Sequence, residues 1–199
     1  MARTAAILCL LVVCIMMLGA DTAQARGLLG QRYASGQLTF TRPGDATLRA
    51  IDNSVWGFAA TGNFPATDRV DVTASVSRRS LEGHGIDIDT SAFLGGVNVM
   101  LSPLDPVCPF IIGRIGLVDT NPGDTDPLIS LGAGVQYDFT AAAALTPSLV
   151  YTHVDDYDDV ILGLEGNYWF TDRVFGIGSL AVGIDDEDVG FMIGAGVEF

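Results

Sequence analysis

The sequence predicts an all-β fold, a closed antiparallel up-and-down barrel of about ten strands, and three observations predict it. Apolar and polar residues alternate with a period of two in segment after segment, whereas helical periodicity is absent. Two chemically different kinds of turn alternate along the chain. The mean hydropathy is +0.39, yet no apolar run after the N-terminal leader is long enough for a helical membrane span.

The leader itself has the layout of a secretory signal peptide. Arg3 precedes an apolar run over residues 5–19, and Ala23-Gln24-Ala25 forms a small-x-small cleavage site. A permanent membrane helix needs about 20 apolar residues, and this run is shorter. No cysteine follows the small residues, so a lipoprotein anchor is not indicated. We therefore expect residues 1–25 to be removed and residues 26–199 to form one domain, in which Cys108 is the one cysteine left and no internal disulfide forms.

Ten segments are expected to form the strands, in chain order. They are residues 31–41, 54–64, 69–81, 88–101, 109–118, 127–139, 144–153, 160–170, 174–184 and 189–199. Alternation is clearest in the sixth, "LISLGAGVQYDF", and it recurs in the eighth, "VILGLEGNYWF", and the tenth. The seventh contains Pro147, and the two faces of the ninth are nearly equal in polarity. Eight strands are therefore an open alternative.

The turns separate the strands into hairpins. Three of those after even-numbered segments, the second, sixth and eighth, repeat one scheme, an aromatic residue followed by a Thr-led turn: "NFPATDRVDV", "QYDFTAAAAL" and "NYWFTDRVFG". Those after odd-numbered segments are acidic and rich in turn formers: "RPGDATLRAIDN", "EGHGID", "DTNPGDTD", "VDDYDD" and "DDED". The alternation indicates that the two ends of the sheet lie in two different environments.

A soluble barrel and a membrane barrel differ in where the apolar face points. Apolar residues lie inside a soluble barrel and outside a membrane barrel. The polar face consists mainly of Gly, Ser, Thr, Ala, Asn and Gln, which suits a crowded interior better than a solvated surface. Aromatic residues end the apolar face at the even-strand turns and are expected to form a girdle where lipid meets water. They are Phe64, Tyr137, Phe139, Tyr168, Phe170 and Phe199. Strands of about 10 residues match a tilted bilayer span. We favour a transmembrane β-barrel and keep the soluble barrel as the alternative.

The C-terminal residues resemble the assembly signal of bacterial outer-membrane barrels, in which a polar residue and a Gly precede hydrophobic or aromatic residues that end in Phe. Met192, Gly194, Val197 and Phe199 occupy those positions, although Met192 replaces the usual polar residue and Val197 the usual aromatic one. Together with the leader and the hairpins, the chain resembles small barrels of the OmpX and opacity-protein type, which usually have eight strands. The resemblance implies location in the outer membrane, with lipid and the barrel-assembly machinery as partners.

The polar face carries five charged residues that are expected to form a barrel-interior network of paired charges. They are Asp71, Arg79, Arg114, Asp138 and Glu165. An unpaired buried charge is costly, and a barrel of ten strands is expected to be largely filled by its own side chains, since aqueous channels appear near 16 strands. A selectivity filter for small ions is the functional alternative.

The remaining charges bear on partners. The chain holds 24 acidic and 10 basic residues, every base an arginine, so nucleic-acid binding is not expected. The acidic turns suggest divalent cations, with Asp119, Asp124 and Asp126 as weak candidate ligands in "DTNPGDTD". That order does not fit an EF-hand loop, because Gly123 precedes Asp124. We expect solvated carboxylates there, and no resident metal or cofactor.

An enzyme is the alternative of a different class. Outer-membrane proteases of the omptin type have ten strands and use an Asp pair and an Asp-His pair near the outer rim. The chain offers Asp87 and Asp89, then His153 with Asp155, but Tyr151 stands where that family places an Asp, and the strands are short. We therefore expect no catalytic residues and a non-enzymatic structural or narrow porin-like envelope protein. A surface interaction or adhesion protein that uses the acidic loops is the second alternative.

Overall fold

The computed structural model describes residues 27–44, 54–83, 86–102, 106–185 and 187–199. The expected signal peptide, residues 1–25, lies outside the described residues. Among the described residues there is no helix with the length and apolarity to cross a membrane.

Ten strands close into one antiparallel barrel, so the count of ten is confirmed and the eight-strand alternative is wrong. The strands are β1 (Tyr33–Arg42), β2 (Val55–Thr67), β3 (Val70–Gly83), β4 (Ile86–Met100), β5 (Val107–Asn121), β6 (Thr125–Thr140), β7 (Ala143–Val154), β8 (Tyr157–Trp169), β9 (Val174–Gly183) and β10 (Val189–Glu198). Each strand pairs with its neighbours in sequence, and β1 pairs with β10 to close the ring, with Ala34 opposite Val197. The topology is therefore up-and-down, without a crossover.

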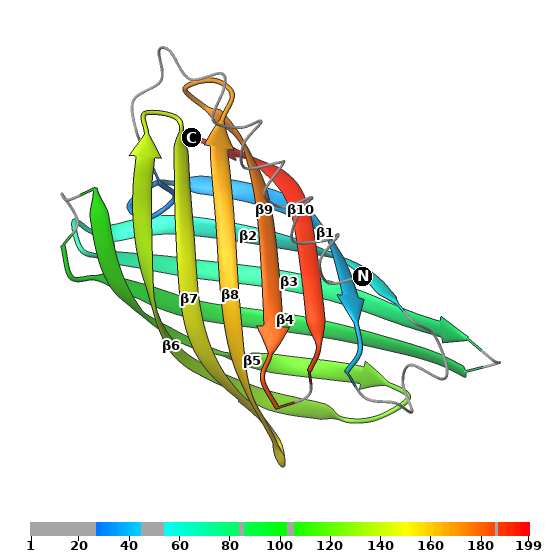
Figure 1. Ribbon diagram of the computed structural model, residues 1–199. Coiled ribbons are helices and arrows are strands. Elements are labelled where there is room, and N and C mark those ends of the chain that lie inside the picture. The colour runs from blue at the N-terminus through cyan, green and yellow to red at the C-terminus, as the bar shows by residue number, and fades with distance from the viewer. Residues whose placement is uncertain (1–26, 45–53, 84–85, 103–105, 186) are drawn as a thin grey trace.

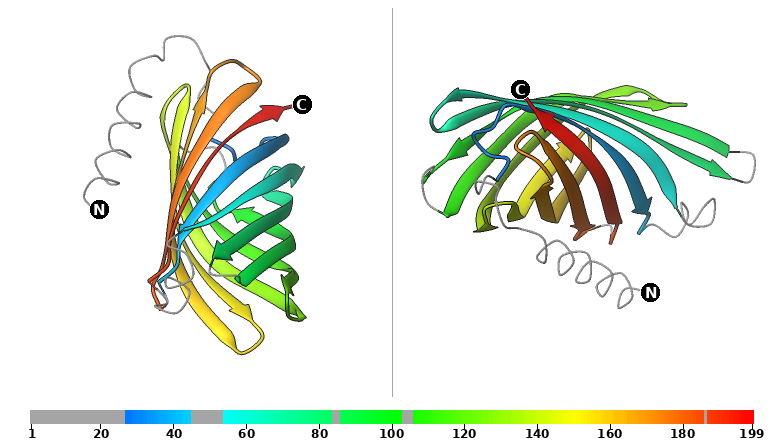
Figure 2. Two further views of the ribbon diagram at one scale, coloured as in Figure 1. Left: turned by 90° about the vertical axis from the view of Figure 1, so that its right-hand side faces the viewer. Right: turned by 90° about the horizontal axis from the view of Figure 1, so that it is seen from above.

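The strands are strongly tilted, as closure of a barrel requires. In Figure 1, β7 to β10 and β1 form the near wall, and β2 to β5 cross behind them at a steep angle. Figure 2 shows the same closed wall from the side and from above. Strand closure leaves no edge with unpaired backbone groups, so the hydrophobic β10 is not an aggregation-prone edge.

Two ends of the barrel differ, and we name them for their connections. Among the described residues, the turn end carries 68–69, 101–102, 106, 141–142 and 170–173 together with Phe199, and the loop end carries 43–44, 54, 122–124, 155–156, 184–185 and 187–188. The first residue of β1 and the last residue of β10 are paired, Tyr33 with Glu198. Both therefore lie at the turn end, as an even number of strands requires.

Bulky apolar side chains lie on the outside of the barrel. Phe170 and Phe199 are 62% and 70% exposed, whereas Gln136 is 5% exposed. The apolar residues of the clearest alternating segment, such as Ile129 and Leu131, are exposed on the outer face. Alternation then turns the polar residues of the same strands toward the axis. The prediction that the small and polar face lines the interior is therefore confirmed for these strands.

Candidate functional site

The interior of the barrel contains a cavity of about 330 Å³ and is the candidate functional site. Hydroxyl and amide side chains from most of the strands form its wall, among them Ser35, Thr61, Ser75 and Ser148. Arg79, Arg114 and Glu165 are its charged residues, and Leu28, Leu29, Phe110, Ile112 and Ile177 are among its apolar ones. The cavity therefore combines a polar wall with an apolar floor.

The floor is made by residues 27–31, which precede β1 and which we call the luminal plug. Its backbone is held by three inward side chains. Leu29 N–H donates to Gln136 Oε1 at 3.1 Å, Gly30 N–H donates to Asp71 Oδ2 at 2.8 Å, and Asn63 Nδ2 donates to Gln31 O at 2.7 Å. Gln136 belongs to β6, which is half-way round the ring from β1. The plug therefore crosses the lumen at the turn end.

Two apolar clusters anchor the two leucines of the plug. Leu28 is buried with Trp169, Phe175 and Ile177 of β8 and β9 and with Ala142. Leu29 packs against a second cluster on β4 and β5. Its members are Met100, Cys108, Phe110 and Ile112. Full burial of an apolar side chain contributes about 1.5–3 kcal/mol, so the buried Leu28 adds to the stabilisation of the plug by its hydrogen bonds.

Glycines on neighbouring strands give the large inward side chains their space. Arg79 lies opposite Gly57 and Arg114 opposite Gly96, and a Cβ atom at either glycine would approach the arginine Cγ to 2.8 or 2.7 Å. The same relation places the Phe110 ring over Gly134, where a Cβ would come within 2.6 Å of the ring. The long side chains can therefore lie along the wall of the lumen.

The five charged residues of the expected interior network fall into two groups. Arg79, Arg114 and Glu165 line the cavity, and Arg114 and Glu165 are electrostatically coupled. Arg79 points inward and is nonetheless exposed, which means that water reaches the lumen at its level. A single paired network of all five residues stays a prediction.

The other two, Asp71 and Asp138, lie at the plug. Asp71 is completely buried and accepts hydrogen bonds from Gly30 N–H and from Asn63 Nδ2, at 2.8 and 3.1 Å. Asp138 lies beside Gly27 and Gln136, and among the described residues its Oδ1 has no hydrogen-bond partner. Asp71 therefore holds a backbone amide of the plug, and Asp138 lies next to the first residue of the plug.

The residues expected to form the aromatic girdle lie at the turn end. Phe64, Tyr137, Phe170 and Phe199 are exposed on the outer face. Tyr137 makes an edge-to-face contact with Phe139 at a ring-centroid distance of 4.9 Å, and Tyr168 makes one with Phe170 at 5.3 Å. Contact of these rings with a lipid-water interface stays a prediction.

The residues that resemble the assembly signal divide between the two faces of β10. Met192 lines the internal cavity, and Gly194 alternates with the exposed Ile193, so both face the lumen. Val197 and Phe199 are exposed outside. Their reading by an assembly machinery stays a prediction.

The residues considered for catalysis are separated around the loop end. His153 Nδ1 lies 2.8 Å from Asp158 Oδ1, and Tyr151 donates to the same oxygen at 2.5 Å. Asp89 instead pairs with Arg78 at 2.6 Å and accepts from Ser80. Asp89 is on β4 and His153 on β7, with β5 and β6 between them. The histidine is therefore not brought to the acid of β4.

The weak metal candidates lie at the β5–β6 connection. Asp119 Oδ1 accepts a hydrogen bond from Thr125 Oγ1 at 2.7 Å. In the part of the chain that the structure describes, no three Asp, Glu, His or Cys side chains are grouped as a metal site would need. Asp119, Asp124 and Asp126 are thus not assembled into one ligand set.

Sequence reasoning missed the plug and the apolar floor. A signal was present, because Trp169 stands among the polar-face residues of its strand, and Phe175 and Ile177 give both faces of β9 a similar polarity. Alternation assigns a residue to a face and says nothing about its partner across the lumen. The plug, with five residues and no periodicity, gave no strand or helix signal.

No family model and no curated protein matches the chain. Solved structures do match. The chain is similar to the β-domain of the Bordetella autotransporter BrkA, with a TM-score of 0.54, 10% identity, and coverage of 85% of this chain and 98% of that chain. It is also similar to the translocator domain of the autotransporter NalP from Neisseria meningitidis, with a TM-score of 0.52, 9% identity, and coverage of 94% and 92%. The KdgM porin matches with a TM-score of 0.48, 9% identity, and coverage of 83% and 99%.

These likenesses concern the fold alone. The closed ten-stranded ring and the structural neighbours define the chain as having the fold of bacterial outer-membrane β-barrels. The expected resemblance to that class of barrel is confirmed at the level of the fold, and the comparisons leave the subfamily open.

Proposed function

We propose that the chain is a bacterial outer-membrane barrel protein without enzymatic activity, and that it provides a narrow, porin-like path which the luminal plug keeps closed. The orientation follows from the resemblance, with the turn end in the periplasm and the acidic loop end outside. The outward apolar side chains support the membrane location. The separation of Asp89 from His153 supports the absence of catalysis at the rim.

The luminal plug is the main observation in support of a closed path through the barrel. The lumen holds a cavity with polar walls, and water reaches it at Arg79. At the turn end, residues 27–31 cross the lumen between β1 and β6, with Leu28 buried and Leu29 half-buried against the wall. A ten-stranded barrel is narrow in any case. Displacement of a five-residue segment is therefore enough to change its conductance.

Conductance in planar bilayers tests this function. The variant Leu28→Asp/Leu29→Asp places two carboxylates into apolar clusters, which is costly because the charges lose water. We expect the plug to leave the lumen and the single-channel conductance to rise at least tenfold over the unaltered protein.

The matched control is Leu128→Asp, which places the same side chain at a buried position of β6 near the loop end, away from the plug. It should not reproduce the tenfold rise in conductance, because the plug stays in place. The gel shift between unheated and boiled protein shows whether each variant has folded. If the folded Leu28→Asp/Leu29→Asp variant and the unaltered protein have equal conductance, the porin-like path is refuted. The surface-interaction alternative would then be the one left.

A further inference from the structure

The outer wall carries an apolar hollow of about 780 Å³ over β1 to β5. Its floor is a row of small outward residues that the strand register aligns: Ala34 opposite Gly62, Gly62 opposite Ala74, and Ala74 opposite Gly95. A Cβ atom at Gly95 would meet nothing within 4 Å, and one at Gly62 would meet a single backbone oxygen at 4.0 Å. No side chain of the described residues therefore covers this floor.

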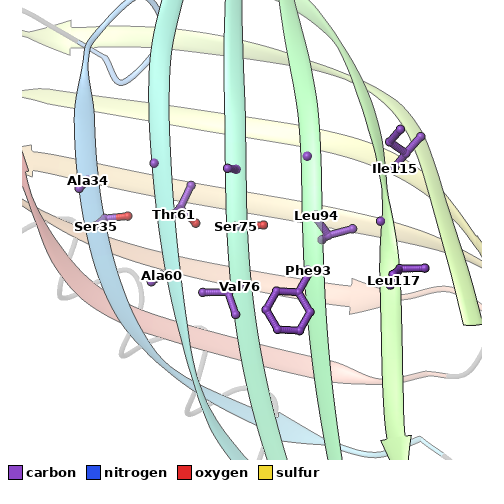
Figure 3. Close-up of a pocket in the computed structure, with 14 residues that line it drawn as sticks. Ala34, Ser35, Ala60, Thr61, Ser75, Val76, Phe93, Leu94, Ile115 and Leu117 are labelled. Atoms are coloured by element: carbon purple, nitrogen blue, oxygen red, sulfur yellow. The ribbon is translucent and has the colours of Figure 1, made fainter. Parts of the chain in front are cut away.

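Larger side chains border the hollow on both sides. The next outward row toward the loop end contains Val76, Phe93 and Leu117, which are paired across β3, β4 and β5. Figure 3 shows Ala60, Val76 and Phe93 beside one another at this border, with Ala34 at the level of the small residues. The row toward the turn end contains Phe64, Val72 and Val97, and it begins at Arg32. The hollow is thus a bounded depression in an otherwise bulky apolar surface.

Arg32 supplies a cation at the turn-end border. Its guanidinium lies over the ring of Phe64, 4.3 Å from the ring centroid, which holds it on the outer face. No carboxylate of the described residues lies within 4 Å of it. Arg78, beyond the opposite border, differs because Asp89 pairs with it at 2.6 Å. The charge available to an anion beside the hollow therefore lies at the turn end.

We propose that this wall binds one glycerophospholipid of the leaflet at the turn end, with an acyl chain in the hollow and its phosphate on Arg32. The inference rests on the proposed location of the barrel in a membrane. The hollow matches hydrocarbon, because its lining is almost entirely carbon, and the guanidinium matches phosphate, to which arginine can donate two parallel hydrogen bonds. The ring of Phe64 fixes the guanidinium in advance, which lowers the entropic cost of binding.

Native mass spectrometry of the full barrel, released from detergent, tests the site with dioleoylphosphatidylglycerol as the probe. We expect the unaltered protein to retain one lipid after the others are stripped. Gly62→Leu/Gly95→Leu fills the hollow without a steric clash in the barrel, and Arg32→Gln removes the cation. Each should lower the fraction of lipid-bound barrel at least fivefold. The neutral probe dioleoylglycerol should bind the unaltered protein and the Arg32→Gln variant equally weakly.

Two controls match these changes. Gly178→Leu fills an open outward position of β9, where a Cβ would also meet nothing within 4 Å, and Arg173→Gln removes a cation from another turn at the same end. Both should retain the lipid. Equal retention by the hollow-filled variant would overturn the proposal, as would a dimer of the unaltered protein that this variant dissociates, since the occupant would then be a second copy. Loss of the unheated-gel shift would instead count against the barrel itself, so the two failures are distinguishable.

Discussion

Leu149→Arg should lower the free energy of unfolding of the barrel in lipid vesicles by about 2–4 kcal/mol, the cost of an arginine near the middle of the lipid-facing wall. Leu149 lies near the middle of β7, is 49% exposed on the outer face, and pairs with Ala133 and Leu162. In the proposed membrane location an arginine there would face acyl chains, because the neighbouring outward side chains are apolar. Urea titration of vesicle-embedded protein, followed by tryptophan fluorescence, measures the change.

The adjacent residue is the control. Ser148 belongs to the same strand but lines the internal cavity, which Glu165 also lines. Ser148→Arg therefore places the same side chain at nearly the same depth in a polar, water-accessible environment, and it should cost less than about 1 kcal/mol. A soluble barrel with an apolar interior requires the reverse order of the two costs. That reverse order would contradict the membrane location on which the proposed function depends.

The pair Ser148 and Leu149 also shows what a sequence of this kind can reveal. A period of two assigns consecutive residues to opposite faces, and the kinds of side chain on each face indicate which one is inside. The boundaries of all ten strands follow the alternating segments closely, including β9, whose faces are similar in polarity. The up-and-down order followed because every connection except residues 43–54, between β1 and β2, is shorter than the dozen residues that a crossover needs.

The luminal plug required information that alternation does not contain. Asp71 and Gln136 both lie on the polar faces of their alternating segments, but their partners are backbone amides of a segment outside the strands, 41 and 107 residues away in sequence. Such contacts depend on which residues share a height within the barrel. Height is set by the register of the closed ring and not by the pattern of any one strand.

The glycines of the lumen have the same explanation. Gly134 was assigned to the polar face as a small residue, and its role appears only when register places it opposite Phe110. The hollow of the outer wall likewise needs four strands in register before Ala34, Gly62, Ala74 and Gly95 become one row. Pairing between strands therefore converts isolated small residues into space for a ring inside and for a ligand outside.

Phe110→Ala should produce the largest loss of stability, about 3–5 kcal/mol, the range for removal of a buried phenylalanine ring. Phe110 is 5% exposed and belongs to the cluster that receives Leu29 of the plug. Its replacement therefore removes packing from the wall and from the plug together. The free energy of unfolding in lipid vesicles measures the loss, and an increased conductance should accompany it.

A double-mutant cycle with Gly134 tests the register that explains this packing. Gly134→Ala alone should cost about 1–3 kcal/mol, because its Cβ would come within 2.6 Å of the Phe110 ring. In the Phe110→Ala background that ring is absent, and the remaining close contact of the added Cβ is with Pro147 O at 3.0 Å. The same substitution should then cost less, which gives a coupling energy of about 0.5–3 kcal/mol. Gly178→Ala, at an open outward position, should be nearly neutral in both backgrounds. Additive costs for Phe110 and Gly134 would show that the ring does not lie over that glycine, and the cross-lumen packing that holds the plug would need a different register.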